Sequence, residues 1–118
     1  MTERWREAAR CRDEGLVLFF PREQHEDEAD DDYRKVVHRH TEFPASFCRR
    51  CPVREECFAL SMKKRATEGV FGGVNQVIRQ RWLKAGRKWR CQADGCGKTI
   101  DPFTLLSDPD IDRCEEHR

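Results

Sequence analysis

Four stretches of the chain carry apolar side chains three or four residues apart, which is the spacing of an α-helix. They predict short helices over residues 5–11 and 32–40, a longer helix from Cys51 to Gly69, and a last helix over residues 74–83. The pattern therefore predicts a small, mostly α-helical fold.

The helix predicted from Cys51 has the clearest signals at its ends. Pro52 suits the first helical position, because its missing N–H would be unpaired there in any case. Cys57 and Leu60 then fall on one face of the helix. Gly69 suits the C-terminal end, since glycine adopts the left-handed conformation without a Cβ clash.

The composition limits how large a hydrophobic core the chain can build. Of 118 residues, 37% are hydrophobic and 38% are charged. Small domains with little apolar material usually need disulfides or a metal ion, and this chain has seven cysteines. The N-terminus has no apolar signal segment and no run is long enough to cross a bilayer, so we expect a cytoplasmic protein with no membrane partner. In a reducing cytoplasm, clustered cysteines indicate metal or redox chemistry.

The net charge of +1 conceals strong segregation along the chain. Seven carboxylates lie in residues 23–32, which predicts a solvated loop inserted in the fold. Residues 61–90 carry nine basic side chains and one acidic side chain, and the segments on either side of them are net acidic. This asymmetry makes residues 61–90 the candidate surface for an acidic partner.

The first cysteine motif is Cys48, Cys51 and Cys57, with Cys11 as a fourth thiol upstream. Each iron of a cubane cluster needs one ligand besides its three sulfides, so four thiolates complete four irons. Several arginines next to these cysteines would offset the negative charge of such a cluster. The spacing alone is equally typical of a structural zinc site on the same four cysteines.

Three segments together resemble the WhiB-like family of bacterial regulators. These are residues 11–21, the Cys-x2-Cys-Pro-Val-Arg-x2-Cys run at 48–57, and Gly-Val-Phe-Gly-Gly at 69–73. The resemblance implies a small helical domain wrapped around a 4Fe–4S cluster that is sensitive to oxygen or nitric oxide. It also implies transcription regulation, often through the C-terminal domain of the principal sigma factor. The cluster ligands that it implies are Cys11, Cys48, Cys51 and Cys57.

The glycine turn comprises Gly69, Val70, Phe71, Gly72 and Gly73, and it has two interpretations. It can expose Val70 and Phe71 as a docking site for a protein partner, or it can be a plain connection with Phe71 buried against the cluster. Phe71 stands where the family usually has tryptophan, so it lacks the indole N–H and some contact area.

A basic block follows the glycine turn, with Trp82 and Trp89 interleaved. Clustered cations bind DNA phosphates without reading sequence, and the resemblance associates this segment with DNA contact. The alternative is a solvated helix face that balances the acidic loop. The candidate DNA contacts are Arg79, Arg81, Lys84, Arg87, Lys88 and Arg90.

A second cysteine set lies beyond the region of resemblance. Cys91, Cys96, Cys114 and His117 offer three thiolates and one imidazole, a donor set that suits tetrahedral zinc. Glycines flank Cys96 on both sides, as a tight metal-binding turn requires. Loose thiols in a flexible tail and a redox disulfide are the alternatives.

These observations predict two units. Residues 1–86 form a WhiB-like iron–sulfur domain with the acidic insertion near 23–32, and residues 87–118 form a basic connector with a zinc-binding C-terminal lobe. We expect a cluster-dependent transcription regulator that binds DNA and sigma factor, with no small-molecule substrate and no enzymatic activity. The alternatives are a cluster-free protein disulfide reductase that uses Cys48 and Cys51, and a structural zinc adaptor.

Overall fold

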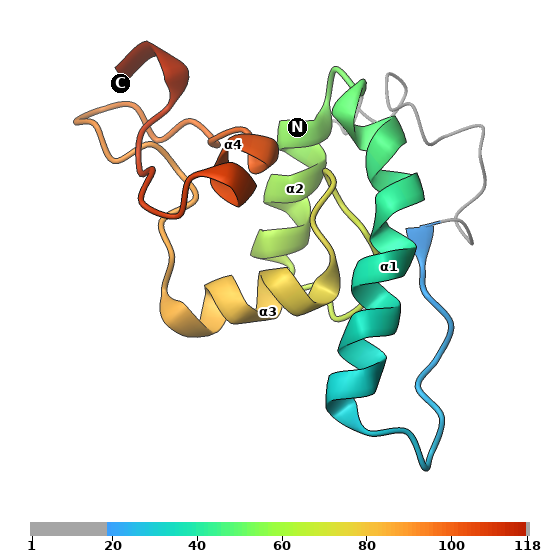
Figure 1. The fold of residues 1–118 in the computed structure, drawn as a ribbon. Helices are drawn as coiled ribbons and strands as arrows, with labels where there is room; N and C mark the ends of the chain where they lie inside the picture. The colour runs from blue at the N-terminus through green and yellow to red at the C-terminus, as the bar shows by residue number, and fades with distance from the viewer. Residues whose placement is uncertain (1–18, 118) are drawn as a thin grey trace.

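The structure is a computed structural model that describes residues 19–117 (Figure 1). Within these residues, pairing of extended backbone is limited to two isolated bridges, Phe71 with Val74 and Arg90 with Thr99. The mostly helical fold predicted from the sequence is confirmed. The helices are α1 (Asp30–Arg49), α2 (Arg54–Lys63), α3 (Gln76–Ala85), α4 (Pro102–Ser107) and the 3-10 helix η4 (Glu115–His117).

Helix α1 is much longer than the predicted helix over residues 32–40. It continues through Pro44 to Arg49, because Val37, Ala45 and Cys48 form a buried stripe along it. Its first turn takes in the last three aspartates of the acidic run, where carboxylates stabilise the positive end of the helix dipole. The helix predicted over residues 5–11 lies outside the described residues. None of the described helices is both long and apolar enough to cross a membrane.

The rest of the acidic run, residues 23–29, lies in a largely exposed loop. Arg22 anchors this loop by donating two hydrogen bonds to the Glu28 carboxylate, at 2.7 and 2.9 Å. The Arg22 hydrogen bonds lower the pKa of Glu28 to about 2. The Tyr33 hydroxyl donates to the Arg22 carbonyl at 2.6 Å, which fixes the loop against α1.

Helix α2 is shorter than predicted at both ends. It begins at Arg54 rather than Cys51, because Pro52 and Val53 are used in the turn that joins it to α1. It ends at Lys63, and Arg65 then takes a left-handed conformation with φ 50°. The predicted end at Gly69 is therefore wrong, since that glycine belongs to a separate turn.

Helix α3 begins and ends two residues later in the chain than the predicted range of 74–83. Asn75 caps its N-terminus by accepting a hydrogen bond from the backbone N–H of Ile78 at 3.0 Å. The Asn75 amide also donates to Thr41 Oγ1 in α1 at 2.9 Å, so the cap joins the two helices. Gly86 ends the helix with φ 69°.

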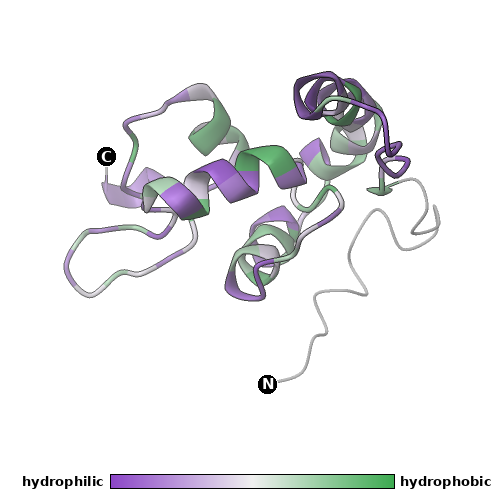
Figure 2. Cartoon of the chain, turned by 90° about the horizontal axis from the view of Figure 1, so that it is seen from below, coloured by the Kyte–Doolittle hydropathy of each residue, from purple (hydrophilic) through white to green (hydrophobic). Residues whose placement is uncertain are grey.

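The main hydrophobic core lies among α2, α3, α4 and the segment that leads into α4. Phe58 packs edge-to-face against Trp82 and Trp89, with ring centroids 6.0 and 5.8 Å apart. Residues on both sides of position 86 contribute to this core, so the C-terminal segment packs directly on α2. Figure 2 shows hydrophilic and hydrophobic residues interspersed along the helices, as expected for a chain with 38% charged residues. The buried members are Phe58, Met62, Val74, Trp82, Ile100 and Leu105.

Candidate metal centres

The first cysteine motif lies where α1 turns into α2. Cys48 is in the last turn of α1, Cys51 is in the connecting turn, and Cys57 is in α2. The Cys51 N–H donates to the Cys48 carbonyl at 3.0 Å, which holds this turn closed. Cys48 and Cys51 are 8% and 6% exposed, and Cys57 is half-buried. Cys11, the fourth predicted ligand, lies outside the described residues.

Apolar side chains from four parts of the chain surround Cys48. It forms a buried cluster with Phe19 and Val70, and Phe47 and Phe103 pack against that cluster. These contacts bring together the segment before the acidic loop, α1, the glycine turn and α4. The surroundings exclude water from the thiol, as a metal-bound thiolate in a protected site requires.

Two arginines lie near the other cysteines of this motif. The Arg54 guanidinium has its pKa raised by its hydrogen bond to Asp101, with a smaller contribution from Cys51. Burial lowers the pKa of Arg79 to about 10, and the interaction with Cys57 opposes that shift. Soft thiol donors in an apolar pocket, with cations beside them, fit an anionic thiolate-bound iron–sulfur cluster.

Arg79 corrects the predicted set of DNA contacts. Its side chain is 0% exposed, and it donates hydrogen bonds to the backbone carbonyls of Gly69, Val74 and Glu68 at 2.7, 2.6 and 3.0 Å. Its guanidinium also lies 5.1 Å from the centre of the Phe71 ring. A buried cation committed to these carbonyls has no surface to offer DNA, so Arg79 is a structural clamp on the glycine turn.

The glycine turn is more buried than the predicted docking role requires. Val70 is 3% exposed because it packs against Phe19 and Cys48, so the expectation that it is exposed is wrong. Phe71 is half-buried and contacts Phe20 edge-to-face, with centroids 6.3 Å apart. Phe71 is therefore the side chain of this turn that remains partly open to solvent.

Gly72 is packed so closely that it leaves no room for a side chain. Its φ is +61°, and a Cβ atom there would lie 2.6 Å from the Arg54 carbonyl oxygen and 2.8 Å from Phe58 Cβ. A Cβ atom at Gly73 would collide with the Phe103 ring of α4. The glycines therefore allow the turn to pack directly on the start of α2, next to the first cysteine motif.

The remaining candidate DNA contacts differ in their exposure to solvent. Arg81, Lys84, Lys88 and Arg90 are exposed, as DNA contact requires. Arg87 is half-buried, donates to the Asp108 carbonyl at 2.6 Å and stacks over Trp82. The exposed positions form the available basic surface.

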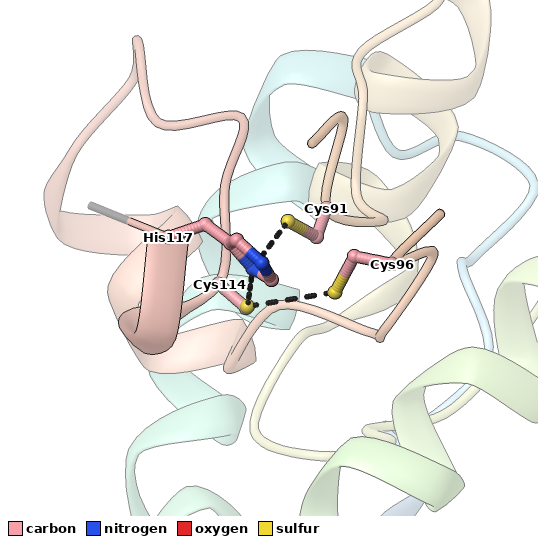
Figure 3. Close-up of side chains that lie close together, drawn as sticks. All are labelled: Cys91, Cys96, Cys114 and His117. Carbon is pink, nitrogen blue, oxygen red and sulfur yellow. Dashed lines mark hydrogen bonds between the residues drawn. The ribbon is translucent and has the colours of Figure 1, made fainter. Parts of the chain in front are cut away.

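The second cysteine set converges on one point in the C-terminal lobe, residues 91–117 (Figure 3). The donor atoms of Cys91, Cys96, Cys114 and His117 all lie within 4.8 Å of one another. Among residues 19–117, this is the group whose donors are close enough to share a single metal ion. The pKa of Cys91 is lowered to about 6. Burial acts to raise this pKa, but the hydrogen bonds to the thiol, of which the one from the Cys114 backbone contributes most, lower it by more.

A comparison with protein families shows the family of the chain. The family described as transcription factor WhiB matches residues 5–82. The chain belongs to the WhiB family. The matched region holds all four cysteines of the first motif and the glycine turn, and it ends before the second cysteine set. A comparison with curated proteins found no match.

Membership of the WhiB family indicates a role as a transcription factor that acts with DNA or the transcription machinery. Two features of this WhiB-family chain were not found from its sequence. The first is the ion pair between Arg54 and Asp101, which are 47 residues apart. The second is the burial of Arg79. The Asn75 cap did carry a sequence signal, because asparagine directly before a helical pattern favours an N-cap.

Proposed function

We propose that this WhiB-family protein is a cytoplasmic, cluster-dependent transcription regulator rather than an enzyme. Cys11, Cys48, Cys51 and Cys57 would hold a 4Fe–4S cluster, one thiolate for each iron. The observation that carries this proposal is the arginine-flanked arrangement of buried Cys48, buried Cys51 and half-buried Cys57 inside the region that matches the family.

The bound cluster would supply redox chemistry that oxygen or nitric oxide can alter. The residues of the chain keep that chemistry in a protected site. Cys48 is enclosed by apolar side chains, while Arg54 and Arg79 bring positive charge toward Cys51 and Cys57. These arginines would offset the negative charge of the bound cluster.

Arg79 connects the first cysteine motif to the glycine turn. It interacts with Cys57 on one side and holds the carbonyls of Gly69 and Val74 on the other. A change at Cys57 therefore alters the group that fixes the glycine turn. Coupling of this kind between a local chemical change and a packed turn is how redox switches produce an output.

Two surfaces are available for that output. A groove with a volume of about 740 Å³ borders the glycine turn at Gly73, and residues of α1, α3 and α4 line it. We propose that the C-terminal domain of the principal sigma factor docks on the glycine turn, where it contacts the partly exposed Phe71 and reaches the groove at Gly73. The exposed cations Arg81, Lys84 and Lys88 would contact DNA phosphates next to it.

Metal analysis of protein purified without oxygen tests the cluster. We expect about four irons and four sulfides per chain, with visible absorbance that Cys11→Ser and Cys57→Ser abolish. Cys96→Ser is the matched control, because it removes a thiol outside this motif and should leave the iron content unchanged. Iron content that is near zero in the wild type, or equal in wild type and Cys57→Ser, would refute the ligand assignment.

A binding experiment tests the output. The sigma-factor domain should bind cluster-loaded protein at least tenfold more tightly than protein without the cluster, and Phe71→Ala should weaken binding. Phe43→Ala is the control, since Phe43 is 62% exposed and lies in α1. Equal binding by all these forms would show that neither the cluster nor the turn controls the interaction.

A further inference from the structure

The donor atoms in the C-terminal lobe have the spacing of a tetrahedral zinc site. Cys96 Sγ lies 3.7 Å from Cys114 Sγ, and His117 Nδ1 lies 3.5 Å from Cys91 Sγ and 3.0 Å from Cys114 Sγ (Figure 3). Zn–S bonds of about 2.3 Å and Zn–N bonds of about 2.0 Å at tetrahedral angles place two sulfurs about 3.8 Å apart and a sulfur and a nitrogen about 3.5 Å apart. The side chains therefore already stand close to the corners of one zinc coordination sphere.

A short hairpin positions the first pair of ligands. The Cys91 N–H donates to the Lys98 carbonyl at 2.7 Å, and the Cys96 N–H donates to the Ala93 carbonyl at 3.1 Å. Gly95 and Gly97 both have positive φ, at 76° and 66°, so the backbone folds back sharply around Cys96. This geometry turns Cys91 and Cys96 toward the same point (Figure 3).

The second pair of ligands comes from the last described turn. Cys114 directly precedes η4, and the His117 N–H donates to the Cys114 carbonyl at 3.0 Å. The Gln92 N–H donates to the Asp112 carbonyl at 2.8 Å, which holds this turn beside the hairpin. Four ligands from two segments thus meet through backbone contacts that are independent of the side chains.

The chemistry of the four donors selects zinc over a disulfide. A disulfide between Cys96 and Cys114 would use two of the four groups and leave Cys91 and the His117 imidazole without a role. Three thiolates with one imidazole form a closed structural zinc set with a net charge of about −1. Lys98 supplies a nearby cation, since its ammonium interacts with Cys96 and Cys114 and pairs with Glu116 at 2.8 Å.

The lobe needs such a centre to hold its shape. From residues 91–117, Ile100 and Leu105 are the apolar non-cysteine side chains in the main core, and both come from the middle of the segment. Ile111 packs against the outside of that core, but Cys91 and His117 are not members of it and meet at the ligand cluster. We propose that Cys91, Cys96, Cys114 and His117 bind one structural Zn²⁺ that closes the C-terminal lobe.

The test measures zinc and iron in full-length protein purified without oxygen. We expect about one zinc per chain in the wild type and in Cys57→Ser, and at least a tenfold loss of zinc in Cys96→Ser and His117→Ala. Unlike Cys96→Ser, Cys96→His should retain zinc, because it keeps four donors. His25→Ala is the matched control, since His25 lies in the exposed acidic loop. Loss of zinc in Cys57→Ser with retention in Cys96→Ser would overturn the proposal by placing the zinc in the first motif.

A second measurement uses the wild type alone, so it stands even where a variant fails to fold. Alkylation followed by peptide mapping should find Cys91, Cys96 and Cys114 protected, and a zinc chelator should make all three reactive. Protection that responds to a reductant but not to the chelator would overturn the proposal in favour of a disulfide. Reactivity that is equal with and without the chelator would overturn it in favour of loose thiols. Iron content reports the first motif separately, so failure of the cluster assignment and failure of the zinc site are distinct results.

Discussion

Arg54 and Asp101 form a two-pronged ion pair that joins the start of α2 to the start of α4. Arg54 donates to the two carboxylate oxygens of Asp101 at 2.9 and 2.7 Å, and it also donates to the Arg49 carbonyl at the end of α1 at 3.1 Å. Asp101 in turn caps α4 by accepting from the Phe103 N–H at 3.1 Å. One arginine therefore links the helix ends beside the first cysteine motif to the C-terminal lobe.

Breaking this pair should loosen both regions together. Both side chains are about 70% buried, so Asp101→Asn should cost about 1 kcal/mol and lower the melting temperature by about 5 °C. In a double-mutant cycle with Arg54→Gln, the second substitution should add little to the first. Arg34→Gln is the control, because its ion pair with Asp31 is exposed and should contribute nothing measurable. Additive losses from the two changes would show that Arg54 and Asp101 act separately.

Gly72→Ala should destabilise the protein far more than Gly86→Ala. Both glycines have φ above +60°, so each alanine costs about 1 kcal/mol of backbone strain. A Cβ at Gly72 also meets the Arg54 carbonyl and Phe58, which adds about 2 kcal/mol, whereas a Cβ at Gly86 meets nothing within 4 Å. Thermal unfolding of the two variants measures the difference. Equal melting temperatures would mean that the turn does not pack on α2.

Arg79→Met should unfold the glycine turn, while Arg81→Met should not. Arg79 is fully buried, and its removal leaves the backbone carbonyls of Gly69 and Glu68 without their side-chain donor, at a cost of about 3 kcal/mol. Arg81 is exposed on the same helix, so the same substitution there should change stability by less than about 0.5 kcal/mol. Chemical denaturation of both variants distinguishes a structural role for Arg79 from a surface role.

Replacing the exposed cations after the glycine turn should weaken DNA binding uniformly across sequences. Changing Arg81, Lys84 and Lys88 to alanine should reduce the slope of log affinity against log salt concentration by about 3, one for each lost phosphate contact. The matched control changes three exposed cations in the first half of α1, which are Arg34, Lys35 and Arg39. If the control variant loses as much affinity, the basic block is not the DNA-binding surface.

Local chemistry determined which parts of this protein could be predicted from the sequence. Cysteine spacing singled out the first motif as a candidate site and grouped the four residues of the second set, whose donor atoms lie within 4.8 Å of one another in the structure. The main positions of α2 and α3 followed from their apolar spacing. The observed ends of α2 and α3 differ from the predicted ends by two residues or more. The length of α1 was underestimated, because the helix continues through Pro44 into a turn that is buried.

Only the tertiary structure decided the roles of residues whose partners lie far along the chain. Sequence placed Arg79 in a basic surface, whereas the fold buries it among the carbonyls of the glycine turn. Asp101 meets Arg54 across 47 residues, and no local pattern encodes that pairing. Burial and ion pairing depend on which segments pack together, and in a chain with so little apolar material those contacts settle only when the whole fold is formed.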